Sequence, residues 1–558
     1  MSTSEDQSIN QVHDVIIIGA GPCGLAIAAR LRETTPSALF TDAEHQRYHW
    51  IQKHKRRTRM VPTKGRATNK VLDDHGERNN RPSTLGNCEG TQYSIVVLDS
   101  FSDSWMAKWK ALFRALEIRN LRSPLFFHPD PADRDGLKGW ANSQGREREM
   151  VELKGVVSKE LSKHRVKSER KKRVMQGPRG KSIDERDKQD YFTPSTGLFN
   201  DFCLNCTEPN KLNGLILHAH ASAIHFNKED SNGEMGGLFT VETSSGNQHA
   251  RSIVLAVGTG IPTGISSKEE ESIGSCHSSD LLKQNALAPQ VQQKINAKAD
   301  TAVIVIGGGF TSAQIVDLCI CEGVSRVWHI MRGHFKVKHF DLDLSWVAKY
   351  KNVNMSAFWM AGTDEERLEM LQTARNGGSI NPSYKAILYA HERRGRLRRY
   401  TQTRVITKDW DAKSKTWKVM TEPPIPNLPA IDYIYFATGT SADVHNMPLL
   451  EPSLKRYPIP TISGLPCQTD DMQWSSEVPL FATGRLAELR LGPGAANLEG
   501  ARVSAERITW RLQERLGQRV ADKDDATRYC SAERLNDLQE RSNSEWIHLN
   551  MYNALYEV

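Results

Sequence analysis

The stretch that decides the fold is HDVIIIGAGPCG, residues His13–Gly24. Its first half, His13–Ile18, is a short β-branched run ended by glycine, which is typical of a buried parallel strand. A helical pattern, LAIAARL, follows at Leu25–Leu31, and Ala38–Thr41 is predicted to form the next strand. The stretch therefore predicts the strand–turn–helix–strand unit of a dinucleotide-binding fold.

Each glycine of this turn has a separate task. Gly19 permits the tight turn, Gly21 lets the backbone approach a pyrophosphate, and Gly24 lets the helix pack against the strand. The helix N-terminus then offers free N–H groups and the positive end of its dipole. Asp42 stands 18 residues after Gly24, where a carboxylate can accept both hydrogen bonds of a ribose diol; Glu44 is the alternative if the strand ends later. These glycines and Asp42 are therefore expected to bind a dinucleotide.

A second unit of the same kind begins at Thr301–Ile306, another buried strand. Gly307 and Gly309 repeat the turn, and Ser312 takes the third small position, so the helix is expected to pack slightly less closely on the strand. A helix over 313–321 and a strand over 326–330 are predicted to follow. No acidic residue ends that strand; Arg332 stands there, and an arginine attracts a 2′-phosphate that a carboxylate would repel. This site therefore favours NADP over NAD.

Two nucleotide folds on one chain predict two nucleotides, and such proteins commonly pair FAD with NAD(P)H so that hydride passes between them. Apolar strands that end in glycine support this arrangement. They lie at Ile253–Gly258, Tyr433–Gly439 and Leu480–Gly484. Gly439 and Gly484 are expected where the chain crosses between the nucleotide domains, and both are candidate cofactor-binding residues.

The predicted architecture is α/β, with two Rossmann-type domains and the NADPH domain inserted into a discontinuous FAD domain. The FAD domain is expected to comprise residues 1–265 and 441–520, and the NADPH domain residues 266–440. Residues 521–558 read as a C-terminal helical tail that packs on the body or on a second copy of the chain.

Composition excludes several other classes of protein. The chain has 558 residues, of which 38% are hydrophobic and 25% charged, so it is neither disordered, collagenous nor a coiled coil. The longest apolar run, Val15–Ala29, is too short and too rich in glycine to cross a bilayer as a helix. Residues 1–10 carry no secretory signal pattern. Nine irregularly spaced cysteines do not form a disulfide framework, which favours a reducing compartment and hence the cytoplasm.

The net charge of +8 comes from one segment, Lys163–Lys181, which holds nine basic residues and one acidic residue, Glu169. A solvated surface segment is the default reading of such a run. An acidic partner, including the phosphate of NADPH, is the alternative. No aromatic residue lies in the segment, so we do not expect it to bind single-stranded nucleic acid by stacking.

The pair Cys203 and Cys206 forms a CxxC motif and leaves a flavin disulfide reductase as an alternative function. The pair precedes the second nucleotide fold, however, whereas a thioredoxin-reductase-like pair is expected inside the NADPH domain. No second CxxC stands at zinc-ligand spacing, so no metal site is predicted.

At these residues the chain resembles the two-dinucleotide-domain flavoproteins, and among them the class B flavin monooxygenases that N-hydroxylate ornithine or lysine. The resemblance rests on Gly19–Gly24, on His277 about thirty residues before the second turn, on Gly307–Ser312 and on Phe436–Gly439. Asn381 falls where that family carries an asparagine near the nicotinamide and the substrate, which makes it the candidate catalytic residue. The oxidative-stress-induced growth inhibitor group is more distantly similar.

The resemblance implies an enzyme in which NADPH reduces FAD and molecular oxygen then forms a C4a-(hydro)peroxyflavin that oxygenates a small molecule. The cofactors carry this chemistry, and the protein positions them and keeps the cavity dry. The family's FxGxxxH signature is absent upstream of His277. Three hypotheses therefore remain at this point: a monooxygenase, a disulfide reductase that uses Cys203 and Cys206, and a regulatory flavoprotein with little turnover.

Overall fold

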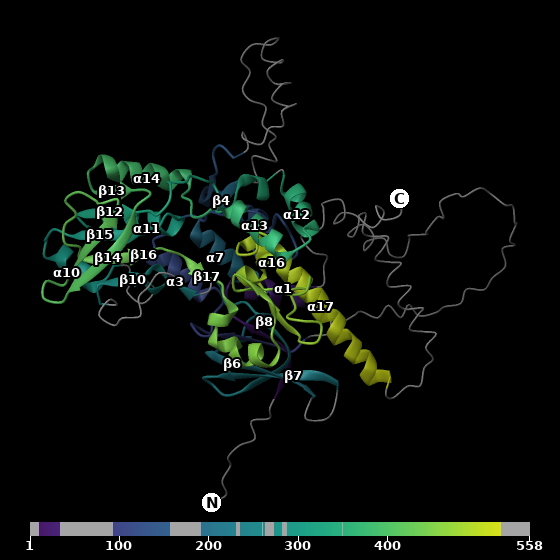
Figure 1. Ribbon diagram of the computed structural model, residues 1–558. Helices are drawn as coiled ribbons and strands as arrows, with labels where there is room; N and C mark the ends of the chain where they lie inside the picture. The colour runs from purple at the N-terminus through teal and green to yellow at the C-terminus, as the bar shows by residue number, and fades with distance from the viewer. Residues whose placement is uncertain are drawn as a thin grey trace, which may run out of the picture.

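The computed structural model describes residues 11–33, 93–156, 191–229, 235–258, 261–262, 273–281, 287–348 and 350–525. Within these residues the strands form two main sheets, which lie apart from each other in Figure 1: β10–β16 at the left and β6, β7 and β8 at the lower centre. The mixed α/β fold with parallel sheets that the sequence predicts is confirmed.

The first sheet has seven strands and is built around the first glycine turn. Its order is β5-β2-β1-β8-β7-β6, with β20 added beside β8. The strands are β1 (Val12–Ile18), β2 (Ile95–Asp99), β5 (Ile216–His218), β6 (Ala221–Glu229), β7 (Met235–Thr243), β8 (Gln248–Leu255) and β20 (Leu480–Ala482). β1 pairs in parallel with β2 on one side and with β8 on the other, so the first turn lies at the centre of the sheet.

The second sheet has five parallel strands in the order β10-β16-β11-β12-β13. They are β10 (Ser275–His277), β11 (Ala302–Ile306), β12 (Arg326–Ile330), β13 (Leu397–Tyr400) and β16 (Tyr433–Phe436). The hairpin of β14 (Arg404–Asp411) and β15 (Thr416–Glu422) covers one face, where Trp417 packs with Ile304 and Trp328. A short ribbon of β9 (Ile261–Pro262) and β17 (Thr440–Ser441) adjoins β16. Two further ribbons pair β3 (Met150–Glu152) with β4 (Phe192–Pro194) and β18 (Thr461–Ile462) with β19 (Leu465–Pro466).

Helices cover both sheets. We call the first sheet with its helices the first body, and the second sheet with its helices the second body. On the first body lie α1 (Pro22–Arg32), α3 (Ala107–Ala115), α4 (Gly136–Ser143), α7 (Thr196–Asn205), α15 (Glu451–Arg456), α16 (Glu488–Leu491) and α17 (Leu498–Asp525), and on the second α10 (Pro289–Asn296), α11 (Phe310–Cys321) and α14 (Pro382–Arg393). The long helix α17 packs along α1 (Figure 1). A buried bidentate pair joins them, in which the Arg30 guanidinium donates to the Glu506 carboxylate from Nε at 2.5 Å and from Nη2 at 3.2 Å. Removal of either partner would leave an uncompensated buried charge and would therefore destabilise the packing of α17 on α1.

Helices α12 (Lys351–Met360) and α13 (Asp364–Arg375) come from the middle of the chain yet pack on the first sheet. Phe358 of α12 and Leu371 of α13 belong to the same buried cluster as Ile16 in β1. The Asp364 carboxylate accepts two hydrogen bonds from the Arg490 guanidinium, at 2.5 and 3.0 Å. The chain therefore leaves the second body after β12 and returns to it at α14.

Candidate functional site

The first glycine turn has the predicted geometry. Gly19 has φ +114°, and a Cβ there would lie 2.3 Å from the carbonyl oxygen of Ala256. A Cβ at Gly24 would lie 2.0 Å from the oxygen of Gly19, so only glycine allows this closeness of helix and strand. At Gly21, by contrast, none of the described residues places a heavy atom within 4 Å of the Cβ position. The turn is therefore closed against the sheet and open on the side where a pyrophosphate would approach.

The carboxylate beside this turn, in the described part of the chain, is Asp99. Asp42, Glu44 and the predicted strand Ala38–Thr41 lie outside the described residues. β2 occupies the edge of β1 and ends at Asp99, whose Oδ2 accepts the Ala20 N–H at 2.8 Å. Its other oxygen accepts backbone N–H groups of residues 101 and 102 at 2.8 and 3.2 Å. Sequence reasoning missed this residue, although the run SIVVLD at residues 94–99 has the pattern of a strand ended by an acid.

Gly484 lies against the first turn as well. It follows β20 with φ +65°, and a Cβ there would lie 3.7 Å from the Cys23 Sγ. Burial raises the pKa of the Cys23 thiol to about 11, partly opposed by a hydrogen bond with Thr483. Thr483 also bonds Ser504 of α17 at 2.5 Å. Gly484, the first glycine turn and α17 therefore meet at one place.

The second glycine turn repeats the first with a different internal support. Gly307 has φ +153°, and a Cβ there would lie 2.3 Å from the Ala437 oxygen, so the turn packs on the end of β16. Gly309 caps α11, and Ser312 is fully buried with its Oγ donating to the Gly309 oxygen at 2.7 Å. The hydroxyl that replaces the third glycine thus bonds within the turn.

His329 of β12 supports the second turn through hydrogen bonds. Its Nε2 donates to the Gly307 oxygen at 2.8 Å and lies 2.9 Å from the Ser312 Oγ. Burial lowers the pKa of this imidazole to about 4, so the ring is neutral near pH 7. This support escaped the sequence analysis, because β12 reads simply as an apolar strand.

The remaining predicted residues lie around the second body. Arg332 is exposed just beyond β12, with Met331 before it and no carboxylate at the strand end. Asn381 is the N-cap of α14, where its Oδ1 accepts the Tyr384 N–H at 2.9 Å. This contact is a structural role for Asn381; its predicted role at the nicotinamide stays a prediction.

Gly439 lies between β16 and β17 with φ +84°. The Nε2 of His277 donates to its oxygen at 3.1 Å, and the Nδ1 of His277 accepts the Ser279 N–H at 3.2 Å. Burial lowers the pKa of His277, the residue that the resemblance singled out. The imidazole therefore ties β10 to the point where the chain leaves the second sheet.

Cys203 and Cys206 are both buried and unpaired in α7 and at its C-terminus. Burial raises the pKa of each thiol well above its ordinary value. Because the thiolate is the reactive form, these residues have the character of core side chains rather than of an exchanging dithiol.

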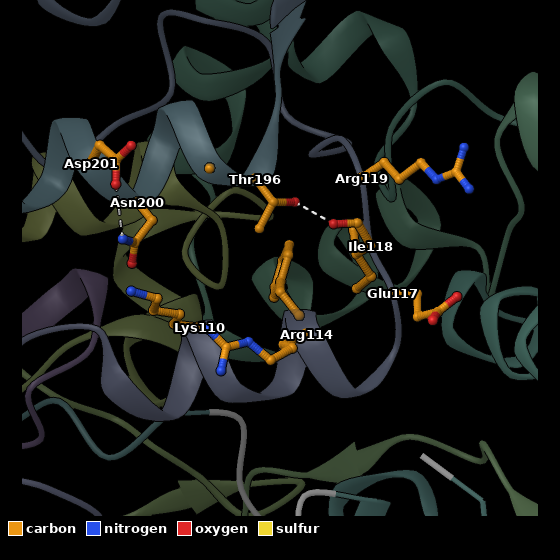
Figure 2. A pocket seen from close by; sticks show the side chains of 10 residues that line it. Lys110, Arg114, Glu117, Ile118, Arg119, Thr196, Asn200 and Asp201 are labelled. Carbon is orange, nitrogen blue, oxygen red and sulfur yellow. Dashed lines mark hydrogen bonds between the residues drawn. The ribbon is translucent and has the colours of Figure 1, made fainter. Parts of the chain in front are cut away.

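A hollow of about 530 Å³ lies between α3 and the N-terminal turn of α7 (Figure 2). Its charged lining is Lys110, Arg114 and Arg119 together with Glu117 and Asp201. No residue of either glycine turn lines it. It is therefore separate from the two nucleotide turns.

Two further predictions, that the chain has no metal site and no membrane-spanning helix, can be examined only in the described residues. Among them no group of His, Cys, Asp or Glu residues is arranged to hold a metal ion. The helices placed in the structure include none with the length and hydropathy of a membrane span. The basic segment Lys163–Lys181 and tail residues 526–558 lie outside the described residues.

Comparison with known proteins gives the geometry a context. Residues 189–439, a little under half of the chain, match the family model of L-lysine 6-monooxygenase/L-ornithine 5-monooxygenase. No curated protein sequence matches the chain.

Solved structures match over almost the whole chain. The ornithine N-hydroxylase of Kutzneria sp. 744, a complex with reduced FAD, NADP⁺ and L-ornithine, matches with TM-score 0.56 at 16% identity, covering 90% of this chain and 100% of that one. The L-lysine 6-monooxygenase of Pseudomonas syringae matches with TM-score 0.54 at 16% identity, covering 90% and 99%. The FAD-bound cadaverine monooxygenase of Erwinia amylovora matches with TM-score 0.55 at 14% identity, covering 91% and 95%.

At these identities the solved structures establish the shared fold, and the family model adds a match in sequence. The resemblance predicted from the glycine turns is thereby confirmed. Residues 189–439 match the L-lysine 6-monooxygenase/L-ornithine 5-monooxygenase family, and the chain as a whole has the two-dinucleotide-domain fold of the ornithine and lysine hydroxylases.

Proposed function

We propose that this protein is an FAD- and NADPH-dependent monooxygenase that oxygenates, by N-hydroxylation or a similar reaction, a small molecule. The observation that carries the proposal is the pair of glycine turns, each placed between a buried parallel strand and a helix N-terminus on one chain. The family match over residues 189–439 supports the same reaction class.

The first turn is the proposed FAD site. The open side of Gly21 fits a pyrophosphate, because no residue placed in the structure lies within 4 Å of its Cβ position. The N-terminus of α1 supplies N–H groups and a positive dipole end to that position. Asp99 orients the Ala20 peptide, and Gly484 leaves room beside the turn. When bound, the flavin supplies the redox and oxygen chemistry, and the chain positions it and excludes water.

The second turn is the proposed NADPH site. Gly307, Gly309 and Ser312 would hold the pyrophosphate at the start of α11, where His329 keeps the turn rigid. Arg332 is exposed beyond the strand end, in a position to attract a 2′-phosphate.

The proposed substrate carries a primary amine on a short aliphatic chain, with molecular oxygen as co-substrate. Ornithine, lysine and cadaverine, which the similar proteins are named for, share this chemistry. We place the reaction in the cytoplasm, in keeping with the irregular cysteines.

The proposed domain division assigns residues 1–265 and 441–520 to FAD binding, residues 266–440 to NADPH binding and residues 521–558 to a tail. In its support, all strands of the second sheet lie between Ser275 and Phe436. Helices α12 and α13 are the exception within residues 266–440, because they pack on the first core.

An aerobic assay tests the function. The purified protein should be yellow, with one FAD per chain, and should oxidise NADPH faster when a suitable amine is added. Hydroxylated product and hydrogen peroxide are measured in the same samples, with ornithine, lysine and cadaverine as first substrates and an amine-free reaction as control. A protein that takes up no FAD on reconstitution would contradict the assignment, as would NADPH oxidation that yields only peroxide with every amine tried.

A further inference from the structure

The two glycine turns differ in what lies over them. We name residues 376–381, which link α13 to α14, the strap. A Cβ at Gly309 would lie 4.0 Å from the Gly378 Cα, whereas no described residue comes within 4 Å of the equivalent position at Gly21. A Cβ on Gly378 itself would lie only 2.9 Å from the Gly309 Cα and N. At the second turn, the backbone of the strap is therefore in contact with Gly309, and among the described residues no segment holds the same place at the first turn.

A side chain from the first body holds the strap in this position. The guanidinium of Arg122 donates to the Ser379 oxygen at 3.2 Å and to the Ser379 Oγ at 2.9 Å. It also donates to the carbonyl oxygens of Lys338, His339 and Phe340 at 3.0, 2.9 and 2.6 Å. These contacts use the fork of N–H donors that distinguishes arginine from lysine.

Arg122 also reaches the second turn directly. Its guanidinium lies 5.2 Å from the ring centroid of Phe310, the first residue of α11 after Gly309. Its neighbour Leu121 is buried in the cluster that includes α1 and α17. One side chain thus connects the core around the proposed FAD site with the turn and the strap of the proposed NADPH site.

Lys336 and Lys338 also form hydrogen bonds with the strap. The Lys336 ammonium donates to the backbone oxygen and Oδ1 of Asn376 at 2.7 and 2.8 Å. The Ile380 N–H donates to the Lys336 oxygen at 3.0 Å, and the Lys338 N–H donates to the Ile380 oxygen at 3.1 Å. The strap is therefore fixed at both ends, and Gly378 lies between the two fixed ends.

We propose that Arg122 is a positioning residue for the nicotinamide nucleotide: it clamps the strap over the second glycine turn, so that NADPH reaches Gly309 only as the strap shifts. The proposal rests on the proposed function, because it takes Gly309 as the pyrophosphate site. The strap carries Asn381 at its end, so the clamp also sets where that side chain lies. A ligand whose binding-competent state is only partly populated binds with an affinity reduced by that fraction. Loosening the clamp should then tighten binding while the bound nucleotide is held less precisely.

Two variants weaken the contact from opposite sides. Arg122→Ala removes the donors, and Gly378→Ala adds a methyl group where the spacing to Gly309 allows none. Matched controls are Arg119→Ala, an exposed arginine three residues earlier, and Gly139→Ala, whose Cβ would meet nothing within 4 Å. Arg122→Lys keeps the charge without the fork and should give an intermediate result.

The first readout is NADP⁺ binding to the FAD-loaded protein by calorimetric titration, with amide hydrogen exchange at Ile380 as the second. Arg122→Ala and Gly378→Ala should bind NADP⁺ about 3- to 10-fold more tightly and exchange faster at Ile380. Flavin reduction at saturating NADPH should become slower in both. The FAD content should stay at the wild-type ratio, and both controls should match the wild type.

Unchanged NADP⁺ affinity in both variants would overturn the proposal. Weaker affinity together with a lower thermal midpoint would overturn it too, because Arg122 would then be a structural residue only. A wild type that binds FAD but no NADP⁺ would instead overturn the proposed function, so the two failures are distinguishable.

Discussion

Replacing Gly21 by aspartate should remove FAD from the protein while leaving its fold intact. Because a Cβ at Gly21 meets no heavy atom of the described residues within 4 Å, Gly21→Asp causes no clash with that part of the chain. The new carboxylate would lie in the space proposed for the pyrophosphate, where it would repel the phosphate charges. Two like charges at about 4 Å repel by about 4 kcal/mol at an effective dielectric constant of about 20, which lowers affinity roughly a thousandfold.

The assay is the ratio of FAD to protein by absorbance after reconstitution, together with the thermal midpoint of the FAD-free protein. Gly139→Asp is the matched control, because Gly139 is exposed on α4 and its Cβ position is also open. Gly24→Ala gives the opposite pattern: its Cβ would lie 2.0 Å from the Gly19 oxygen, so the fold itself should lose about 1–3 kcal/mol. If Gly21→Asp protein retains FAD at the wild-type ratio, the first turn does not hold the flavin nucleotide.

Arg332→Ala should narrow the preference for NADPH over NADH by up to about 1.5–3 kcal/mol, the value of a hydrogen bond to a charged group; an unchanged preference in stopped-flow reduction would mean that another group reads the 2′-phosphate. The double variant Cys203→Ala/Cys206→Ala should reduce its flavin at the wild-type rate, because both thiols are buried; lost turnover with a lost charge-transfer band would favour a disulfide reductase. The wild-type free energy of unfolding should decrease as the pH drops from 6.5 to about 4, because the His329 ring is protonated in the unfolded chain but stays neutral in the folded one. His329→Gln should remove this part of the decrease. That part amounts to about 3 kcal/mol, and equal slopes by thermal unfolding would contradict the assignment. Asn381→Ser should keep the helix cap, whereas Asn381→Ala should lose about 1 kcal/mol of stability; if the serine variant couples NADPH oxidation to product as the wild type does, the amide has no part in the reaction.

Both nucleotide turns could be predicted from the sequence, because their signals are local. The β-branched run before Gly19 and the run before Gly307 each fix a strand, and the glycines follow at positions where backbone crowding excludes a side chain. The fold class followed from the recurrence of the same unit on one chain. The open side of Gly21 agrees with the task predicted for it.

Contacts between distant segments could not be predicted in the same way. Asp99 reaches the Ala20 peptide across 79 positions of the chain, and the pairing of β2 with β1 that brings it there leaves no local mark. His329 supports Gly307 through a contact between neighbouring parallel strands, which an apolar pattern does not encode. Arg122 meets the Ser379 hydroxyl 257 positions away. In each case the partner is set by tertiary packing.

The packing of α12 and α13 on the first core restricts how the five-stranded sheet can move. A domain attached only through the ribbon of β9 and β17 could rotate about that ribbon. Here the Arg490 guanidinium holds Asp364 of α13, so the chain between β12 and α14 gives the second sheet a further connection to the first core. Because the strap links α13 to α14, we expect a rotation of the second sheet against the first core to change the backbone of the strap and with it the access to the second turn.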